Sequence, residues 1–409
     1  MGRRFGWFLG AYGVSALGTW LAFGAFPVIA VQVLHAGPAE VALLSSAAAL
    51  AGAAAAVPLG ARVEHRRKRP VMVAADLVRC AALLTVPAGY ALGALTLPWL
   101  LGVTALVATA EVTFRAASGA YLRTLLPEGE LLAANARLEA TSWTATAVGP
   151  PLGGALVGLL GPVATVAADA VSHLLSALGL GAIGGREPVR PRPEATHRRD
   201  LLDGWRLILA DPVLRPLLLH TALFNGLVTA TEPLLAVLML GQLGFAPWQY
   251  GLAFALPSLG GLLGARLARP LAARLGEYRV LRAAGTLRAL WPLGLVLVGP
   301  GTGGLVVVTV VELGLIVCCA VFNPLHATWR LRRTGPGHTV RVLTAWSVTT
   351  RLATGLLTAG WGVLGSVVGV RTALGLAGAV VLVTPLLLPS RGNSTRRFCQ
   401  WSAVRWNQR

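Results

Sequence analysis

Long apolar runs, most of them nearly free of charge, dominate this sequence. A helix needs about 20 apolar residues to cross the roughly 30 Å hydrocarbon core of a bilayer. We therefore predict an all-α integral membrane protein with about twelve spans, at residues 5–34, 40–61, 70–92, 95–121, 133–160, 162–184, 213–240, 248–268, 279–299, 303–328, 340–364 and 370–389. Only 12% of the 409 residues are charged, about half the fraction in a soluble protein.

The first run follows Arg3 and Arg4, as the apolar core of a secretory signal peptide would. It continues almost without charge from Phe5 to Leu34, whereas a signal core has only ~7–15 residues. We therefore predict that this run is the first transmembrane helix.

The Lys and Arg residues concentrate in every second connector between the predicted spans. The connectors at 35–39, 93–98, 159–163, 241–247 and 299–304 contain none. The clusters occupy the other connectors, at Arg62–Arg69, Arg123–Arg137, Arg186–Arg215, Arg266–Arg282 and Arg330–Arg341, and only Arg371 lies on the opposite side. Positively charged loops stay in the cytoplasm. We therefore expect a multi-pass protein of the cell membrane, with an even number of spans and both termini cytoplasmic.

Similar segments recur in the same order in the two halves of the chain. Residues 25–38 match 231–247 and pair Pro27 with Pro233, residues 58–81 match 270–290 and pair Arg79 with Arg288, and "TSW" at 141–143 matches "TAW" at 344–346. We predict two six-helix halves at 1–184 and 213–389, a cytoplasmic central loop at 185–212 and a cytoplasmic tail at 390–409. Such a repeat is typical of secondary transporters that bind their substrate between the halves.

The connector after the second span resembles the major facilitator superfamily, in which this loop follows G-x-x-x-D-R-x-G-R-R. The corresponding positions here are Gly60, Glu64, His65, Arg66, Lys68 and Arg69. Three positions are substituted: Glu64 replaces Asp, His65 replaces Arg, and Arg67 replaces the second Gly. The resemblance implies that the carboxylate of Glu64 holds the loop against neighbouring helices, and that Asp76 and Arg79 on the next helix belong to the same gating region.

A second motif resembles the antiporter motif of that superfamily, which ends in G-P-x-x-G-G. Gly149, Pro150, Gly153 and Gly154 match it. Small residues at this spacing let helices approach closely, so tight packing is the alternative explanation. Together with residues 125–138 and 168–177, the motif is similar to the macrolide-efflux and enterobactin-exporter branch of drug:proton antiporters, and this similarity implies export.

The energy source follows from what the sequence lacks. A P-loop needs a Gly-Lys-Ser/Thr sequence, and the single lysine, Lys68, is flanked by arginines. We therefore expect an ion gradient, by default protons, to drive transport. The chain has no metal-ligand spacing of cysteines and no recurring Ser/His/Asp cluster, so we predict neither a metal site nor a cofactor nor an enzyme.

Ionisable groups inside the membrane are costly and therefore usually functional or paired. Glu111, Glu232 and Glu312 fall on spans four, seven and ten, which line the cavity in the family that this chain resembles, and all three stay candidates for proton or cation handling. Arg115 lies one turn from Glu111, and Arg351 is a further counter-charge. Trp20 and Phe23 on the first span are candidates for contact with an apolar cargo.

We therefore expect a monomeric, proton-coupled exporter of small amphipathic molecules, antibiotic-like or siderophore-like. Two alternatives stay open, a transporter of lysophospholipids or other lipids with the same fold and a transport-inactive sensor or scaffold. Protons, the small-molecule substrate and membrane lipid are the expected partners. The net charge of +19 lies in short loop clusters rather than in a basic domain, which argues against nucleic-acid binding.

Overall fold

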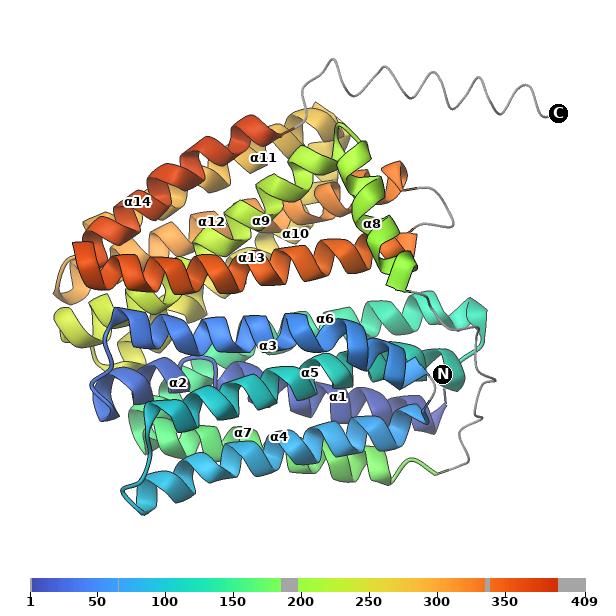
Figure 1. Ribbon diagram of the computed structural model, residues 1–409, viewed down its shortest axis with the longest axis horizontal. Coiled ribbons are helices and arrows are strands. Elements are labelled where there is room, and N and C mark those ends of the chain that lie inside the picture. Colours follow the sequence, from blue (N-terminus) through green and yellow to red (C-terminus); the bar gives the residue numbers. More distant parts are fainter. Residues whose placement is uncertain (1, 65, 185–197, 335–338, 389–409) are drawn as a thin grey trace.

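The computed structural model describes residues 2–64, 66–184, 198–334 and 339–388, and the regular structure in these ranges is helical (Figure 1). The N-terminal half consists of α1 (Arg3–Leu21), α2 (Ala25–Val28), η1 (Ile29–Val33), α3 (Pro38–Glu64), α4 (Lys68–Ala91), α5 (Leu97–Leu125), α6 (Glu128–Leu160) and α7 (Pro162–Gly181). The C-terminal half consists of α8 (Arg198–Ala210), α9 (Leu214–Ala236), η2 (Val237–Gln242), α10 (Pro247–Leu275), α11 (Glu277–Leu290), η3 (Trp291–Leu297), α12 (Gly301–Arg333), α13 (Thr339–Val368), α14 (Val370–Val383) and η4 (Thr384–Leu387).

Within these ranges, 12 helices are long and apolar enough to cross a membrane. Their bounds differ from the predicted spans by a few residues at most ends, so the prediction of about twelve spans is confirmed. The predicted tail at 390–409 and the last residue of the twelfth predicted span lie outside the described residues.

The predicted central loop contains a helix that the search for long apolar runs could not find. The helix α8 is amphipathic and packs on α13, where the Trp205 indole N–H donates to the Thr349 hydroxyl at 2.9 Å. Its 13 residues are too few to span a bilayer. The segment from 185 to 197 lies outside the described residues.

The two ends of the helix bundle differ in charge. At the basic end lie the connectors that carry the Lys and Arg clusters, together with α8 and the N-terminus (right side of Figure 1). At the neutral end lie the connectors without them. Arg371, the exception in the sequence pattern, starts α14 at the neutral end and donates to the Val296 carbonyl at 2.9 Å. This bond gives that arginine a local structural partner.

The matched segments around Pro27 and Pro233 have the same backbone form. Each proline is followed by a π-helical segment, η1 after Pro27 and η2 after Pro233. The segments end alike, because the amides of Leu34 and Ala36 donate to the carbonyls of Ile29 and Ala30, and those of Leu243 and Phe245 donate to Leu238 and Met239. π-Helical turns are rare and often occur at functional sites. The sequence repeat pointed to the pair of prolines but not to this geometry.

The halves pack together at the neutral end and separately at the basic end. One buried apolar cluster at the neutral end contains residues of both halves, including Val31 and Leu240. At the basic end, one cluster around Phe8 and Tyr121 contains only N-terminal residues, and another around Leu281 and Phe322 contains only C-terminal residues. The apolar contact that closes the bundle therefore lies at the neutral end.

Candidate transport pathway and its charged residues

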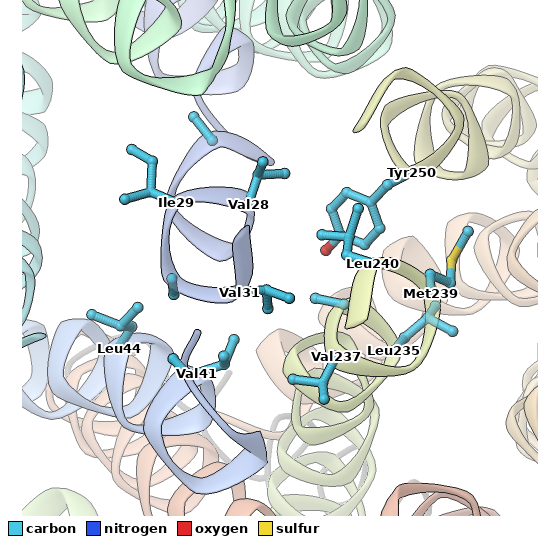
Figure 2. Close-up of a cluster of buried hydrophobic side chains, with 14 of the residues drawn as sticks. Val28, Ile29, Val31, Val41, Leu44, Leu235, Val237, Met239, Leu240 and Tyr250 are labelled. Carbon is cyan, nitrogen blue, oxygen red and sulfur yellow. The ribbon is translucent and has the colours of Figure 1, made fainter. Parts of the chain in front are cut away.

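The neutral end is closed by the aliphatic side chains around the two π-helical segments. Figure 2 shows Val31 of η1 facing Val237 and Leu240 of η2, with Val28 and Tyr250 beside them. All five are buried. A polar solute cannot cross such a contact without losing its hydration, so we call these residues the neutral-end seal.

The glycines of the predicted antiporter motif lie where helices meet. A Cβ on Gly149 would overlap Trp20 of α1, and one on Gly153 would overlap the Leu21 carbonyl. A Cβ on Gly154 would lie 2.8 Å from the Cα of Gly251, in the other half. The motif therefore sets both the packing of α6 on α1 and the contact of α6 with α10. Whether it also decides the direction of transport stays a prediction.

The predicted aromatic residues flank the contact between the halves. The rings of Trp20 and Phe23 are 5.6 Å apart, and Phe23 meets Phe254 of α10 at 5.8 Å in an edge-on contact. Phe23, Pro150 and Tyr250 help to line a cavity of about 10 Å³, room for about one water molecule. Phe23 is thus part of the closed side of the pathway in this conformation.

Below the seal, Glu232 of α9 and Glu312 of α12 form an acidic pair in the C-terminal half. The charge of Glu312 acts on Glu232, and both charges act on the Tyr250 side chain. Glu312 is buried and Glu232 is half-buried. Among the residues that the structure describes, neither carboxyl forms a hydrogen bond or an ion pair. Sequence reasoning singled out both acids but could not bring them together.

The third predicted acid has counter-charges. Glu111 of α5 forms an ion pair with Arg115 at 2.7 Å. The Glu111 side chain is 30% exposed and the Arg115 side chain 60% exposed. Arg351 of α13 also acts on the Glu111 charge from the other half, and its guanidinium lies against Gly52 of α3. Glu111 is therefore partly neutralised in this conformation.

The structure describes only part of the predicted gating loop. His65 and the surroundings of Gly60 and of the Glu64 side chain lie outside what the structure describes, so the predicted latch stays a prediction. The ammonium group of Lys68 donates to the carbonyls of Val63 and Arg66, at 2.8 Å and 2.6 Å. Arg66 is exposed and Arg69 half-buried. Lys68 thus closes the end of α3, where cations interact favourably with the helix dipole.

Asp76 and Arg79 belong to a larger buried cluster than the sequence indicated. Their side chains are 3.5 Å apart and also meet Ser15 of α1 and His173 of α7. We call this set the α1–α4–α7 cluster; its members are Ser15, Thr19, Asp76, Arg79, Asp169, Ser172 and His173. The i, i+4 spacing of Asp169 and His173 was the only sequence signal for its α7 portion.

The C-terminal half buries a different arrangement at the position that the repeat pairs with Arg79. The Arg288 guanidinium lies between the rings of Phe224 and Phe322, 3.8 Å and 3.6 Å from their centroids. It also donates to His220 Nε2 at 2.6 Å. Stacking on aromatic faces stabilises a buried guanidinium. The described residues provide it with no carboxylate partner.

Two proteins with similar sequences are named as transporters. The alignment with the MFS-type transporter y4rN of Sinorhizobium fredii is 30% identical over 235 residues, 55% of this chain and 56% of the relative. The multidrug efflux pump Tap of Mycolicibacterium fortuitum is 27% identical over 269 residues, 61% of this chain and 63% of the relative. Both alignments cover less than two thirds of the relative's length.

Solved structures share the fold over nearly the whole chain. The nucleoside transporter NupG superposes with a TM-score of 0.75 at 11% identity, covering 94% of this chain and 97% of NupG. A bacterial homologue of the iron transporter ferroportin, solved in an inward-facing state, gives a TM-score of 0.72 at 18% identity and covers 94% and 97%.

The family model of the Major Facilitator Superfamily matches residues 8–328. This match agrees with the 12 candidate spans and with the pair of similar halves. The chain therefore belongs to the Major Facilitator Superfamily and is a multi-pass membrane protein.

Proposed function

We propose that this transporter exports small amphipathic molecules, antibiotic-like or siderophore-like, across the cell membrane in exchange for protons. Two observations support export: the antiporter motif at Gly149–Gly154 and the similarity to a multidrug efflux pump. The absence of a P-loop lysine in the sequence supports an ion gradient as the energy source, and one charge crossing 100 mV gains about 2.3 kcal/mol.

The positive-inside rule assigns the basic end to the cytoplasm. The neutral-end seal then faces the outside, and on the cytoplasmic side each half has its own buried apolar cluster. In this orientation the conformation is ready to take up a cargo from the cytoplasm or from the inner leaflet.

The observation that carries the proposal is the acidic pair of Glu232 and Glu312. Two carboxylates near each other in a low-dielectric site cannot both stay ionised without a counter-charge. Since neither forms an ion pair with the described residues, a bound proton or a cationic cargo has to supply the missing charge. Competition of these two for the same site links the exit of one to the entrance of the other.

Glu232 lies next to the irregular part of its span. It precedes Pro233, and η2, which contributes Val237 and Leu240 to the seal, begins one turn later. A change of charge at Glu232 therefore acts close to the segment that has to move when the neutral end opens. Tyr250, which helps to line the cavity under the seal, interacts electrostatically with both acids.

Purified protein in vesicles, with ethidium as the probe, tests this proposal. We expect Glu232→Gln and Glu312→Gln each to abolish the ethidium movement that a pH gradient drives, because a neutral amide binds neither a proton nor a cation. Glu111→Gln is the matched control, since Glu111 already has Arg115 as its counter-charge, and we expect it to keep transport. Full pH-driven transport in both C-terminal variants would overturn the proposal.

A cellular assay separates drug export from the lipid alternative. Expression in a host that lacks its own efflux pumps should lower susceptibility to some members of a panel of amphipathic antibiotics. An uncoupler should remove this protection, because it collapses the proton gradient. Unchanged susceptibility to the whole panel, combined with movement of labelled lysophospholipid in the vesicles, would favour the lipid transporter instead.

A further inference from the structure

The α1–α4–α7 cluster contains a histidine whose two ring nitrogens both face oxygen atoms. His173 is fully buried. Its Nδ1 lies 3.2 Å from the Ser15 hydroxyl and 3.5 Å from Asp76 Oδ1, and its Nε2 lies 3.2 Å from Asp169 Oδ1. We propose that His173 is a proton-binding site, charged in this conformation, and separate from the acidic pair of the C-terminal half.

The carboxylate beside Ser15 favours a proton on Nδ1. Arg79 donates to the Ser15 hydroxyl oxygen at 3.2 Å, since a guanidinium can only donate. The Ser15 hydroxyl proton points to Asp76 Oδ1 at 3.4 Å, since a carboxylate can only accept. In that arrangement Ser15 accepts from His173, and Nδ1 is the donor. Asp76 Oδ1, 3.5 Å from the same nitrogen, is a second acceptor that favours a proton on it.

The other ring nitrogen faces the Asp169 carboxylate. That contact is an ion-pair contact rather than an aligned hydrogen bond, because the N–H direction of Nε2 misses Asp169 Oδ1. A neutral ring with its proton on Nδ1 would place an unprotonated, partly negative Nε2 3.2 Å from this carboxylate oxygen, which is repulsive. A second proton turns the contact into an attractive one. Both nitrogens then carry protons, and the ring is positively charged.

The charge balance of the cluster leads to the same result. Asp76 and Asp169 contribute two negative charges, and Arg79 contributes one positive charge. A neutral His173 would leave the cluster with one net negative charge in the membrane interior, whereas a protonated His173 makes it neutral. An uncompensated charge away from water is unfavourable, so one bound proton completes the set.

The elements around His173 provide few other charges. Cys80, on the same helix as Asp76, is a thiol that interacts with the Asp76 charge, and Glu111 of α5 interacts with Arg79. Thr19 of α1 accepts from Arg79 at 2.8 Å, and Ser172 donates to Asp169 at 3.3 Å. In the described parts of α2, α3 and α6, no side chain forms a hydrogen bond or ion pair with the cluster.

The other half offers an internal comparison. His220 lies on α9, which corresponds to α1 in the sequence repeat, and contacts Arg288, the counterpart of Arg79. Its Nε2 accepts from Arg288 at 2.6 Å, while its Nδ1 lies 2.9 Å from the Thr384 carbonyl and donates to it. One nitrogen accepts and the other donates, so this ring is neutral. The two buried histidines thus differ in charge because only His173 has carboxylates on both sides.

The position of the cluster connects its charge to the transport movement. α1 continues through α2 into η1, which forms part of the neutral-end seal. Gly18 of α1 lies directly against Ser172 of α7, where a Cβ would overlap the serine side chain. Loss of the proton would leave net negative charge at this tight contact. We therefore expect the proton on His173 to hold α1 and α7 together while the neutral end is closed.

Nitrogen NMR of the full chain in lipid vesicles, with ring-labelled histidine, tests the charge directly. An ordinary histidine titrates near pH 6.5, so at pH 8 the exposed rings are neutral. We expect one charged imidazole signal per chain at pH 8. It should disappear in His173→Gln and remain in His220→Gln, the matched control from the other half.

A second variant covers the case in which His173→Gln does not fold. Asp169→Asn preserves the size of the side chain and removes one of the two negative charges, so the charged imidazole signal at pH 8 should be lost or clearly weaker. Absence of a charged imidazole at pH 8 in the unaltered protein, or its persistence in His173→Gln, would overturn the proposal. The signal is read without any cargo, so its outcome is independent of the ethidium assay on Glu232 and Glu312.

Discussion

Gly154 of α6 and Gly251 of α10 lie back to back across the contact between the two halves. A Cβ on Gly154 would lie 2.8 Å from the Cα of Gly251, closer than two carbon atoms pack. Nearby, the Ser258 hydroxyl of α10 donates to the Ala147 carbonyl of α6 at 3.2 Å. The antiporter motif thus brings two backbones together, and the closed state depends on that approach.

We expect Gly154→Ala to weaken closure at the neutral end. The added methyl group meets backbone atoms that cannot rotate away, and overpacking of this kind costs about 1–3 kcal/mol. A cost of about 1.4 kcal/mol changes an equilibrium tenfold. In a cysteine-free background, Phe23→Cys should therefore react about tenfold faster with a charged maleimide added at the neutral end.

Gly102→Ala is the control for this experiment, because a Cβ at Gly102 would meet no atom within 4 Å. It should leave the labelling rate unchanged. Equal rates in the Gly154→Ala and Gly102→Ala proteins would show that the approach of the two glycines does not limit closure.

The predicted sidedness can be tested by labelling in intact cells. Ala94 and Thr302 are exposed at the neutral end, and Arg67 is exposed at the basic end. An impermeant reagent added outside should modify Ala94→Cys and Thr302→Cys but reach Arg67→Cys only after the membrane is opened. The reverse pattern would invert the orientation and remove the exporter proposal with it.

The buried and the exposed ion pairs should differ in their contribution to stability. Asp76→Ala leaves Arg79 buried without its carboxylate, which costs about 3–5 kcal/mol, so the apparent Tm in detergent should fall clearly. Arg115→Ala removes a pair with an exposed partner, worth about 0–1 kcal/mol, and should change the apparent Tm little. Similar Tm values for the two variants would contradict the cluster as described.

Arg288→Lys tests the aromatic clamp of the C-terminal half. A lysine ammonium group cannot stack between Phe224 and Phe322 and also donate to His220, whereas the planar guanidinium does all three. A desolvated cation–π contact contributes about 2 kcal/mol or more, so we expect a lower apparent Tm.

Arg282→Lys, on the same helix, is the matched control for the clamp. Arg282 is exposed and donates to the Tyr278 hydroxyl at 3.2 Å. This variant should unfold at the same temperature as the unaltered protein. An unchanged Tm in Arg288→Lys as well would show that the two rings do not depend on a planar cation.

The sequence alone determined the spans, the family and the local pairs. The bilayer sets the length of each apolar run, so the spans could be read directly. Neighbours on one helix could also be read, because residues three or four apart share a face. The Glu111–Arg115 and Asp76–Arg79 pairs were found in this way, and both exist in the structure.

Only the tertiary structure decided which distant helices meet. It placed Asp76 beside His173, Glu232 within range of Glu312, and Phe224 and Phe322 on either side of Arg288. Each of these contacts joins residues far apart in the chain, and spacing along one helix carries no information about them. Which helices become neighbours depends on how small residues such as Gly154 let them pack, and that is a property of the assembled bundle.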